Sequence, residues 1–232
     1  MKLLALDTSS EGCSAALLIN GSLTERFALA PRGHTRLLMP MIRELLAEQG
    51  LAPAELDALA FARGPGSFTG LRIATGVVQG LAWGLEVPVV PVSSLAAVAL
   101  SAMETLNVAE GDGLAIAFDA RMGEVYWGCF QASEGLPRLL VPEQVCAPAS
   151  VSLPSVITGS WYGAGQGWQL QDQMPQALVA TMSRLDDTLV PRASHVARLA
   201  SHELAAGGGV SAAEAQPVYV RDEVTWKKLP GR

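Results

Sequence analysis

A glycine-rich run between two apolar segments constrains the fold of this chain most strongly. Residues 64–72 read Gly-Pro-Gly-Ser-Phe-Thr-Gly-Leu-Arg, after the apolar stretch 58–62 and before an uncharged segment at 73–85. The short apolar run predicts a buried strand, and the longer segment predicts a helix. A glycine-rich turn between them points backbone N–H groups at one spot, where an anion or another backbone can come close. The sequence therefore predicts an α/β fold with a candidate binding loop.

The composition favours a folded chain that does not bind nucleic acid tightly by itself. Of the 232 residues, 50% are apolar and 16% are charged, which supplies a large core. The formal net charge is −6, whereas a phosphate backbone is held by clustered cations. The nearest basic cluster is the tail with Trp226, Lys227, Lys228 and Arg232, which a solvated terminus explains equally well.

Cysteine spacing and apolar runs indicate a protein of the reducing cytoplasm with no membrane span. Cys13, Cys129 and Cys146 show no C-x-x-C spacing, so they predict neither a disulfide framework nor a zinc site. The first apolar run ends at Asp7, too early for a signal peptide. The uncharged stretch 87–103 contains prolines and is short for a membrane span. We therefore expect a soluble, cytoplasmic protein.

The chain repeats one arrangement of elements. An apolar strand at 3–6 ends in Asp7, and another at 114–118 ends in Asp119; a tight turn and a second strand follow each. This weak repeat predicts two related α/β lobes, residues 1–108 and 109–232, with the closing segment folding back onto the body. Two aspartates facing each other could position a metal–phosphate complex or a water. Alternatively, each caps its own turn, and both interpretations stay open.

The glycine run is open to two interpretations as well. It is not a Walker A motif, because no lysine follows Gly70. As a phosphate site it would act with the turns after the two aspartates, whereas as a structural turn its glycines only permit tight geometry. The candidate nucleotide or phosphate residues are Asp7, Thr8, Ser9, Gly64, Gly66, Ser67, Thr69, Asp119 and Arg121.

The helix after the glycine run carries an unusual stripe. Gly76, Gly80 and Gly84 follow Arg72 at intervals of four residues, so they share one face of the helix. Each glycine costs about 1 kcal/mol relative to alanine in a helix, which implies compensation from another backbone close by. That backbone belongs either to the chain's own sheet or to a second subunit. The predicted association surface combines this helix with an apolar one near 35–49: Leu37, Leu38, Met41, Leu45, Arg72, Ile73, Gly76, Val77, Gly80 and Leu81.

No catalytic or metal-binding set emerges from the sequence. His195 and His202 are seven residues apart, about 10 Å along a helix, which is too far to chelate one ion. His34 has no ligand neighbour in sequence, and no G-x-S-x-G elbow is present. We therefore expect no metal site and no catalytic residue in this chain.

Six sequence blocks together resemble the TsaB family, formerly called YeaZ. They are 4–9, 34–42, 64–73, 91–95, 119–126 and 217–221, which read LALDTS, HTRLLMPMI, GPGSFTGLRI, PVSSL, DARMGEVY and PVYVR. The resemblance runs nearly end to end and leaves only residues 145–190 without a signature.

The resemblance implies a two-lobed fold of the actin/Hsp70/sugar-kinase (ASKHA) class. It also implies a subunit without catalysis of its own, which acts with the paralogue TsaD and the ATPase TsaE. Together they would form N6-threonylcarbamoyladenosine at position 37 of tRNAs that read ANN codons. The helices after residue 34 and after the glycine run would pair with TsaD, or with a second copy in a homodimer.

Further expectations concern cofactors and alternatives. ATP or ADP is expected only at a composite interface, and tRNA only through the complex. The two histidine ligands of TsaD would fall at Ser94 and Val98, which cannot act as imidazole ligands. A different reading is an independent ATPase or phosphotransferase that uses Asp7 and Asp119. A zinc glycoprotease is disfavoured by the histidine inventory.

Overall fold

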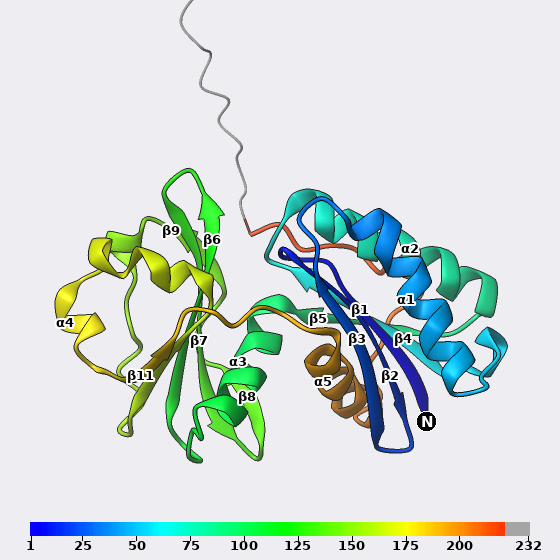
Figure 1. Cartoon of the computed structure of the whole chain (residues 1–232). Coiled ribbons are helices and arrows are strands. Elements are labelled where there is room, and N and C mark those ends of the chain that lie inside the picture. Colours follow the sequence, from blue (N-terminus) through cyan, green and yellow to red (C-terminus); the bar gives the residue numbers. More distant parts are fainter. Residues whose placement is uncertain (221–232) are drawn as a thin grey trace, which may run out of the picture.

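A computed structural model describes residues 1–220 of this chain as two α/β lobes that lie side by side (Figure 1). In the first lobe, β1 (Lys2–Asp7), β2 (Gly12–Ile19) and β3 (Ser22–Leu29) form an antiparallel meander. Next to β1 follow β4 (Ala58–Gly64) and β5 (Val89–Ser93), both parallel to it. The sheet order is therefore β3-β2-β1-β4-β5. The basic tail and Arg221 lie outside the described residues.

Helices cover both faces of the first sheet, which explains its uninterrupted apolar strands. Leu4, Leu6 and Phe61 pack under α1 (His34–Glu48) and α2 (Phe68–Leu85). The opposite face, rich in alanine, packs on α5 (Ala193–Ala205), which returns from the far end of the chain. A short 3₁₀ turn, Pro53–Glu55, precedes β4.

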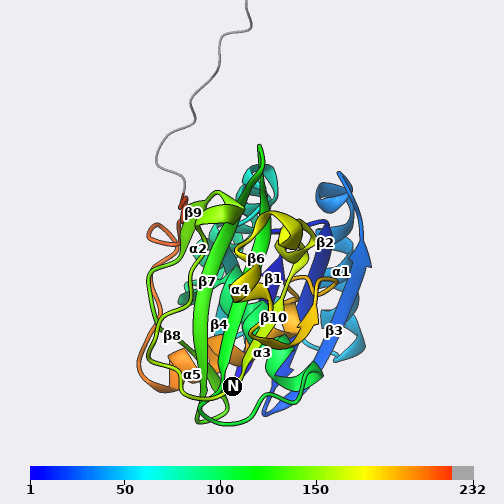
Figure 2. The same ribbon diagram turned by 90° about the vertical axis from the view of Figure 1, so that its left-hand side faces the viewer.

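The second lobe repeats the topology of the first. The strands β6 (Gly113–Arg121), β7 (Glu124–Ser133) and β8 (Leu136–Leu139) form the meander, and β10 (Trp161–Ala164) and β11 (Met182–Asp186) lie parallel to β6. The order β8-β7-β6-β10-β11 matches that of the first sheet strand for strand (Figure 2). The expected two-lobed ASKHA-type fold is confirmed.

The remaining elements of the second lobe cover its two faces. The helix α3 (Ser94–Thr105) packs Leu95 and Val98 on one face. On the other face lie α4 (Gln176–Val179) and the 3₁₀ segments Pro148–Ser150 and Gln166–Gln173, around Trp127 and Trp168, whose ring centroids are 5.6 Å apart. A short strand β9 (Gln144–Cys146) pairs with the first half of β7, whereas β8 pairs with its second half. These elements account for the region 145–190 that lacked a signature.

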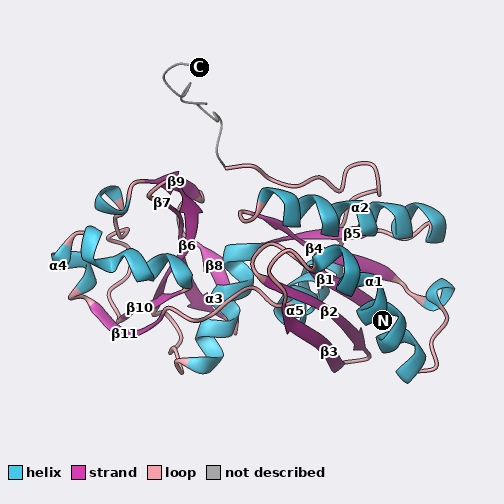
Figure 3. Ribbon diagram, turned by 45° about the horizontal axis from the view of Figure 1, so that its top comes forward, coloured by secondary structure: helices cyan, strands magenta, loops and turns pink. Residues whose placement is uncertain are grey.

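The chain after α5 runs back along α2 (Figure 3). Val210 and Val89 exchange backbone hydrogen bonds of 2.8 and 2.9 Å, and the Val218 amide donates to the Arg63 carbonyl at 2.8 Å. The division at residue 108/109 stays a prediction, since α5 and this segment pack on the first lobe although they follow the second. No helix within residues 1–220 is long and apolar enough to cross a membrane.

Candidate functional site at the glycine loop and helix α2

The glycine loop closes directly onto the turn that follows β1. The Ser67 amide donates to the Ser9 carbonyl at 2.7 Å, and the Thr8 hydroxyl donates to the Gly70 carbonyl at 2.6 Å. At the start of α2, the Ser67 hydroxyl accepts from the Gly70 amide at 3.3 Å and so acts as the N-cap. The structure thus brings the first-lobe candidates for a nucleotide loop into one place, with Ser67 and Thr69 exposed at its rim.

The loop glycines are required by the chain's own backbone. A Cβ at Gly66 would overlap the Ser9 carbonyl oxygen, and one at Gly70 would overlap that of Thr8. Gly64 has φ +113°, and a Cβ there would lie 2.7 Å from the Val218 carbonyl oxygen. These contacts support the structural interpretation of the glycine run, because each glycine permits a close approach of two backbone segments.

The two aspartates that begin the repeat lie in different surroundings. Asp7 is fully buried, and its Oδ1 accepts from the Ser9 amide at 2.8 Å. Asp119 has a side chain 41% exposed; its Oδ1 accepts from the Arg121 amide at 2.7 Å, and its Oδ2 lies 3.1 Å from the Arg121 guanidinium. Each aspartate therefore caps its own turn, as the structural alternative predicts.

Burial gives Asp7 an unusual acidity. Loss of solvent raises the pKa of Asp7 to about 6, although the hydrogen bond from the Ser9 amide and the nearby His34 oppose the rise. Within residues 1–220, neither Asp7 Oδ2 nor the Ser9 hydroxyl finds a hydrogen-bond partner. The His34 ring Nε2 lies 3.0 Å from the Ser10 carbonyl oxygen, on the far side of the same turn. The turn thus holds a carboxyl group with one uncommitted oxygen.

The glycine stripe of α2 faces outward. A Cβ built at Gly76, Gly80 or Gly84 meets no atom of the described chain within 4 Å, and all three residues are exposed. We call these three residues the glycine face. The backbone expected to pack against these glycines could come from the chain's own sheet or from a second subunit. Within residues 1–220 the sheet is excluded, because it lies on the opposite side of α2.

Different side chains line the two edges of the glycine face. On the α1 side, Ile73, Val77 and Leu81 are half-buried, as is Leu37 of α1. On the other edge, Phe68 is 55% exposed and Trp83 is 75% exposed. Sequence analysis missed these two aromatic residues, although projecting α2 onto a helical wheel would have placed them beside the glycines.

Three residues expected on the association surface are core residues. Leu38, Met41 and Leu45 of α1 are buried against the first sheet, with exposures of 1%, 8% and 0%. The single apolar stripe of α1 covers the sheet, so it cannot also be presented to a partner. The expectation that these three side chains offer accessible surface is therefore wrong.

Arg72 is held in place by two aromatic rings. Its guanidinium carbon lies 3.6 Å from the centroid of the Phe68 ring, and its Nε donates to the Tyr219 hydroxyl at 3.1 Å. The Phe68 and Tyr219 centroids are 5.5 Å apart. Stacking of this kind fixes a long cationic side chain before any partner arrives.

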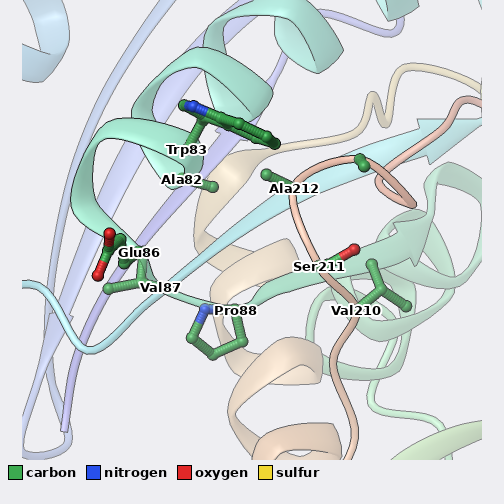
Figure 4. Close-up of a pocket in the computed structure, with 9 residues that line it drawn as sticks. Ala82, Trp83, Glu86, Val87, Pro88, Val210, Ser211 and Ala212 are labelled. Carbon is green, nitrogen blue, oxygen red and sulfur yellow. The ribbon is translucent and has the colours of Figure 1, made fainter.

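Two grooves lie between α2 and the returning segment. The larger, about 550 Å³, is lined by Trp83 and Pro88 on one side and by Val210 and Ala212 on the other (Figure 4). The smaller, about 370 Å³, is lined by Arg72, Gln79 and Tyr219 among others, and Gln79 donates to the Ala215 carbonyl at 2.9 Å. The glycine face and its edges are thus continuous with a surface that two chain segments build together.

Histidines and cysteines form no cluster in the described part of the chain. No three His, Cys, Asp or Glu side chains within residues 1–220 come close enough to hold a metal ion. Burial raises the pKa of the Cys13 thiol to about 11 and of the Cys129 thiol to about 12, which disfavours the nucleophilic thiolate. Ser94 and Val98 are fully buried in α3.

Comparison with known proteins defines the family. A family model described as "TsaD: tRNA N6-adenosine threonylcarbamoyltransferase" matches residues 28–216. The tRNA threonylcarbamoyladenosine biosynthesis protein TsaB of Haemophilus influenzae is 40% identical over 100% of this chain and 98% of its own length, and that of Escherichia coli is 38% identical over 100% of both. The solved structure of YeaZ from Pseudomonas aeruginosa is 47% identical, with a TM-score of 0.88 over 94% of this chain and 99% of that one. This chain belongs to the TsaB family, within the wider group that the TsaD model describes.

Proposed function

We propose that this chain is a non-catalytic scaffold subunit in the formation of threonylcarbamoyladenosine on tRNA. The names of its relatives supply the pathway, since they are called tRNA threonylcarbamoyladenosine biosynthesis proteins. The observation that carries the scaffold role is the glycine face, where three consecutive helical turns leave backbone open to solvent. A helix that gives up about 1 kcal/mol at each glycine is expected to recover it through close backbone contact with a partner.

The proposed partner is the paralogue TsaD, whose family model this chain also matches. The contact surface consists of the glycine face with its edges: Leu37, Phe68, Arg72, Ile73, Gly76, Val77, Gly80, Leu81, Trp83 and Tyr219. Two paralogues built on one topology can pair helix to helix, and a second copy of this chain could pair through the same surface. The ATPase TsaE would be a third member, and tRNA would be reached through the complex.

The hydrogen bonds of the glycine loop support a role without catalysis. The Ser67 amide already donates to the Ser9 carbonyl and the Gly70 amide to the Ser67 hydroxyl, so neither amide is free for a phosphate group. Asp119 is already engaged by its own turn. ATP or ADP bound at a composite interface with a partner remains a proposal, as does a cytoplasmic location.

A second candidate function is an independent ATPase or phosphotransferase. One observation favours it: Asp7 Oδ2 and the Ser9 hydroxyl have no hydrogen-bond partner within residues 1–220, although both are buried beside the loop. Slow ATP turnover by the isolated chain that disappears in Asp7→Ala would support this candidate. Turnover unchanged by the substitution would point to a contaminant.

The scaffold proposal is tested by omission. The purified chain is mixed with the cognate TsaD and TsaE, tRNA, ATP and threonylcarbamoyl-adenylate, and modified adenosine is scored with each component left out in turn. We expect product only when this chain and TsaD are both present. Equal product without this chain, or product made by this chain without TsaD, would overturn the proposal.

A further inference from the structure

One buried carboxylate of the second lobe reaches into the first. Residues 140–143 link β8 to β9 along the edge of the second sheet, where the Leu140 amide donates to the Cys129 carbonyl at 2.9 Å. The side chain of Glu143, at the end of this link, is 7% exposed. Its Oε1 accepts from the Ser93 hydroxyl, and its Oε2 lies 3.9 Å from the Arg63 guanidinium.

The two partners of Glu143 lie at the carboxyl ends of neighbouring strands in the first sheet. Arg63 and Ser93 lie at the carboxyl ends of β4 and β5, which are parallel neighbours. In open α/β sheets, ligands bind outside this end of the parallel strands. Glu143 thus places an anionic group of the chain itself at that edge.

Each partner also holds a second element. The Ser93 hydroxyl accepts from the Ala96 amide at 3.1 Å and so caps α3, while the Arg63 carbonyl accepts from the Val218 amide at 2.8 Å. The contact therefore joins the second lobe to the start of α3 and to the strand that anchors the returning segment.

At its other end, α3 is fixed to the second lobe. The Leu106 carbonyl, which follows α3, accepts from the Arg184 guanidinium at 2.9 Å, and Leu95 and Val98 pack on the second sheet. This end of α3 is tied to the first lobe as well, because Glu104 pairs with Arg198 and His195 of α5. A movement between the lobes would then be largest at the β5–α3 junction, which lies at the opposite end of α3 and is where Glu143 binds. A buried carboxylate is tolerated only while its hydrogen bond and its charged partner are both in place, so this contact is either made or broken.

We propose that Glu143 is a latch that holds the two lobes closed at the carboxyl ends of β4 and β5. When the carboxylate leaves Ser93 and Arg63, the second lobe turns away from the first about the far end of α3, where Glu104 binds α5, and the edge becomes accessible. The latch is formed within the chain itself, so this proposal does not depend on the proposed pairing with TsaD.

The latch is tested by measuring the distance between the lobes. Spin labels are placed at the exposed positions Arg36 of α1 and Asp172 of the second lobe by Arg36→Cys and Asp172→Cys, in the full chain carrying Cys146→Ser. Cys13 and Cys129 are buried and stay in place. Double electron–electron resonance is recorded for this parent, for Glu143→Ala, and for the matched control Glu134→Ala, which changes an exposed carboxylate in the β7–β8 turn of the same lobe.

We expect one narrow distance distribution for the parent and the control, and a shift to longer, broader distances for Glu143→Ala. A distribution identical to the parent in a folded Glu143→Ala protein would overturn the proposal. If Glu143→Ala does not fold, Glu143→Gln takes its place with amide hydrogen exchange as the readout. Faster exchange confined to residues 93–97 and 140–146 would support the latch, and exchange equal to the parent would refute it.

Discussion

Two groups of glycines at and before α2 lie in opposite surroundings. In the loop before α2, Gly66 and Gly70 have no room for a side chain, because carbonyl oxygens of the chain's own Ser9 and Thr8 lie against them. On the outer side of α2, Gly76, Gly80 and Gly84 have open space around every position that a Cβ would take. The first group is explained by the fold, whereas the second group is left unexplained by it.

The difference separates what stabilises the chain from what the chain offers to others. A glycine that admits another backbone stabilises the fold despite its conformational cost. A solvent-exposed glycine inside a helix only destabilises that helix, unless a second molecule covers it. The loop glycines therefore serve the fold, and the glycine face is the surface for which we propose an association.

The largest effect should come from filling the loop. Gly70→Ala forces a Cβ onto the Thr8 carbonyl, and we expect it to lower the free energy of unfolding by about 3 kcal/mol or more. Chemical denaturation at pH 7 measures the change, with Gly84→Ala as the matched control. Native-like stability of Gly70→Ala would contradict the difference between the two groups of glycines, because the loop would then have space for a Cβ atom.

A pH effect of comparable size should come from Asp7, which is fully buried. With the folded pKa raised from 3.8 to about 6, the native state binds the proton more tightly than the unfolded chain. This contribution to stability is present below about pH 4 and is lost as the pH rises through 6, amounting to roughly 3 kcal/mol. Asp7→Asn keeps an oxygen for the Ser9 amide and should remove this loss.

Unfolding by denaturant at pH 4 and pH 8 checks the prediction for Asp7. The matched control is Asp119→Asn, at the equivalent but exposed position of the second lobe, for which we expect a change within about 0.5 kcal/mol. If the native chain and Asp7→Asn lose equal stability between pH 4 and pH 8, the Asp7 carboxyl is not the source of the loss.

A smaller effect, of opposite sign, should come from the glycine face. Gly80→Ala adds a methyl group to open space on a helix, so the isolated chain should gain about 1 kcal/mol in unfolding free energy. Denaturation of the two proteins below their self-association threshold measures it. A loss of stability would mean that the face is packed in the free chain, contrary to the structure.

The smallest effect should come from the edge beside the glycine face. Tyr219→Phe removes the hydroxyl that accepts from Arg72 while it keeps the ring beside Phe68. Because the hydrogen bond is exposed, we expect a change in stability of at most about 0.5 kcal/mol. Titration calorimetry with TsaD should show a weakening of a few-fold, through greater freedom of Arg72. A weakening as large as that of a substitution on the glycine face itself would make Arg72 the dominant contact.

The architecture was predictable from sequence because each lobe begins with a buried strand that carries an aspartate at or near its end, although β6 continues to Arg121, two residues beyond the predicted end at Asp119. The surroundings of those aspartates were not, since Asp7 and Asp119 occupy the same position in the pattern. Only the folded chain shows that the first aspartate is fully buried, in the turn onto which the glycine loop closes, while the second stays partly exposed. The secondary structure of residues 145–190 was not predictable either, because β10 and β11 are too short to show the alternation of apolar and polar residues that marks a strand.

The exposure of the proposed association surface was only partly predictable. The four-residue spacing placed the glycines on one face of α2, but it left open whether that face meets the chain's own sheet or a second subunit; the structure shows that it faces outward. The apolar stripe of α1 was assigned to the same surface, although a stripe that covers a sheet and one that binds a partner look alike in sequence. Leu38, Met41 and Leu45 show which of the two it is, since all three lie in the core.

The most direct test of the account is the affinity of Gly80→Leu for TsaD, measured together with its thermal unfolding. The control is Ala205→Leu, an exposed position on α5 at the opposite face of the first sheet. We expect Gly80→Leu to unfold at or above the unfolding temperature of the native chain and to bind TsaD at least about tenfold more weakly, a loss of about 1.4 kcal/mol. The control should bind normally. Undiminished binding by folded Gly80→Leu, or unfolding of the isolated chain, would contradict the claim that the glycine face is a partner surface.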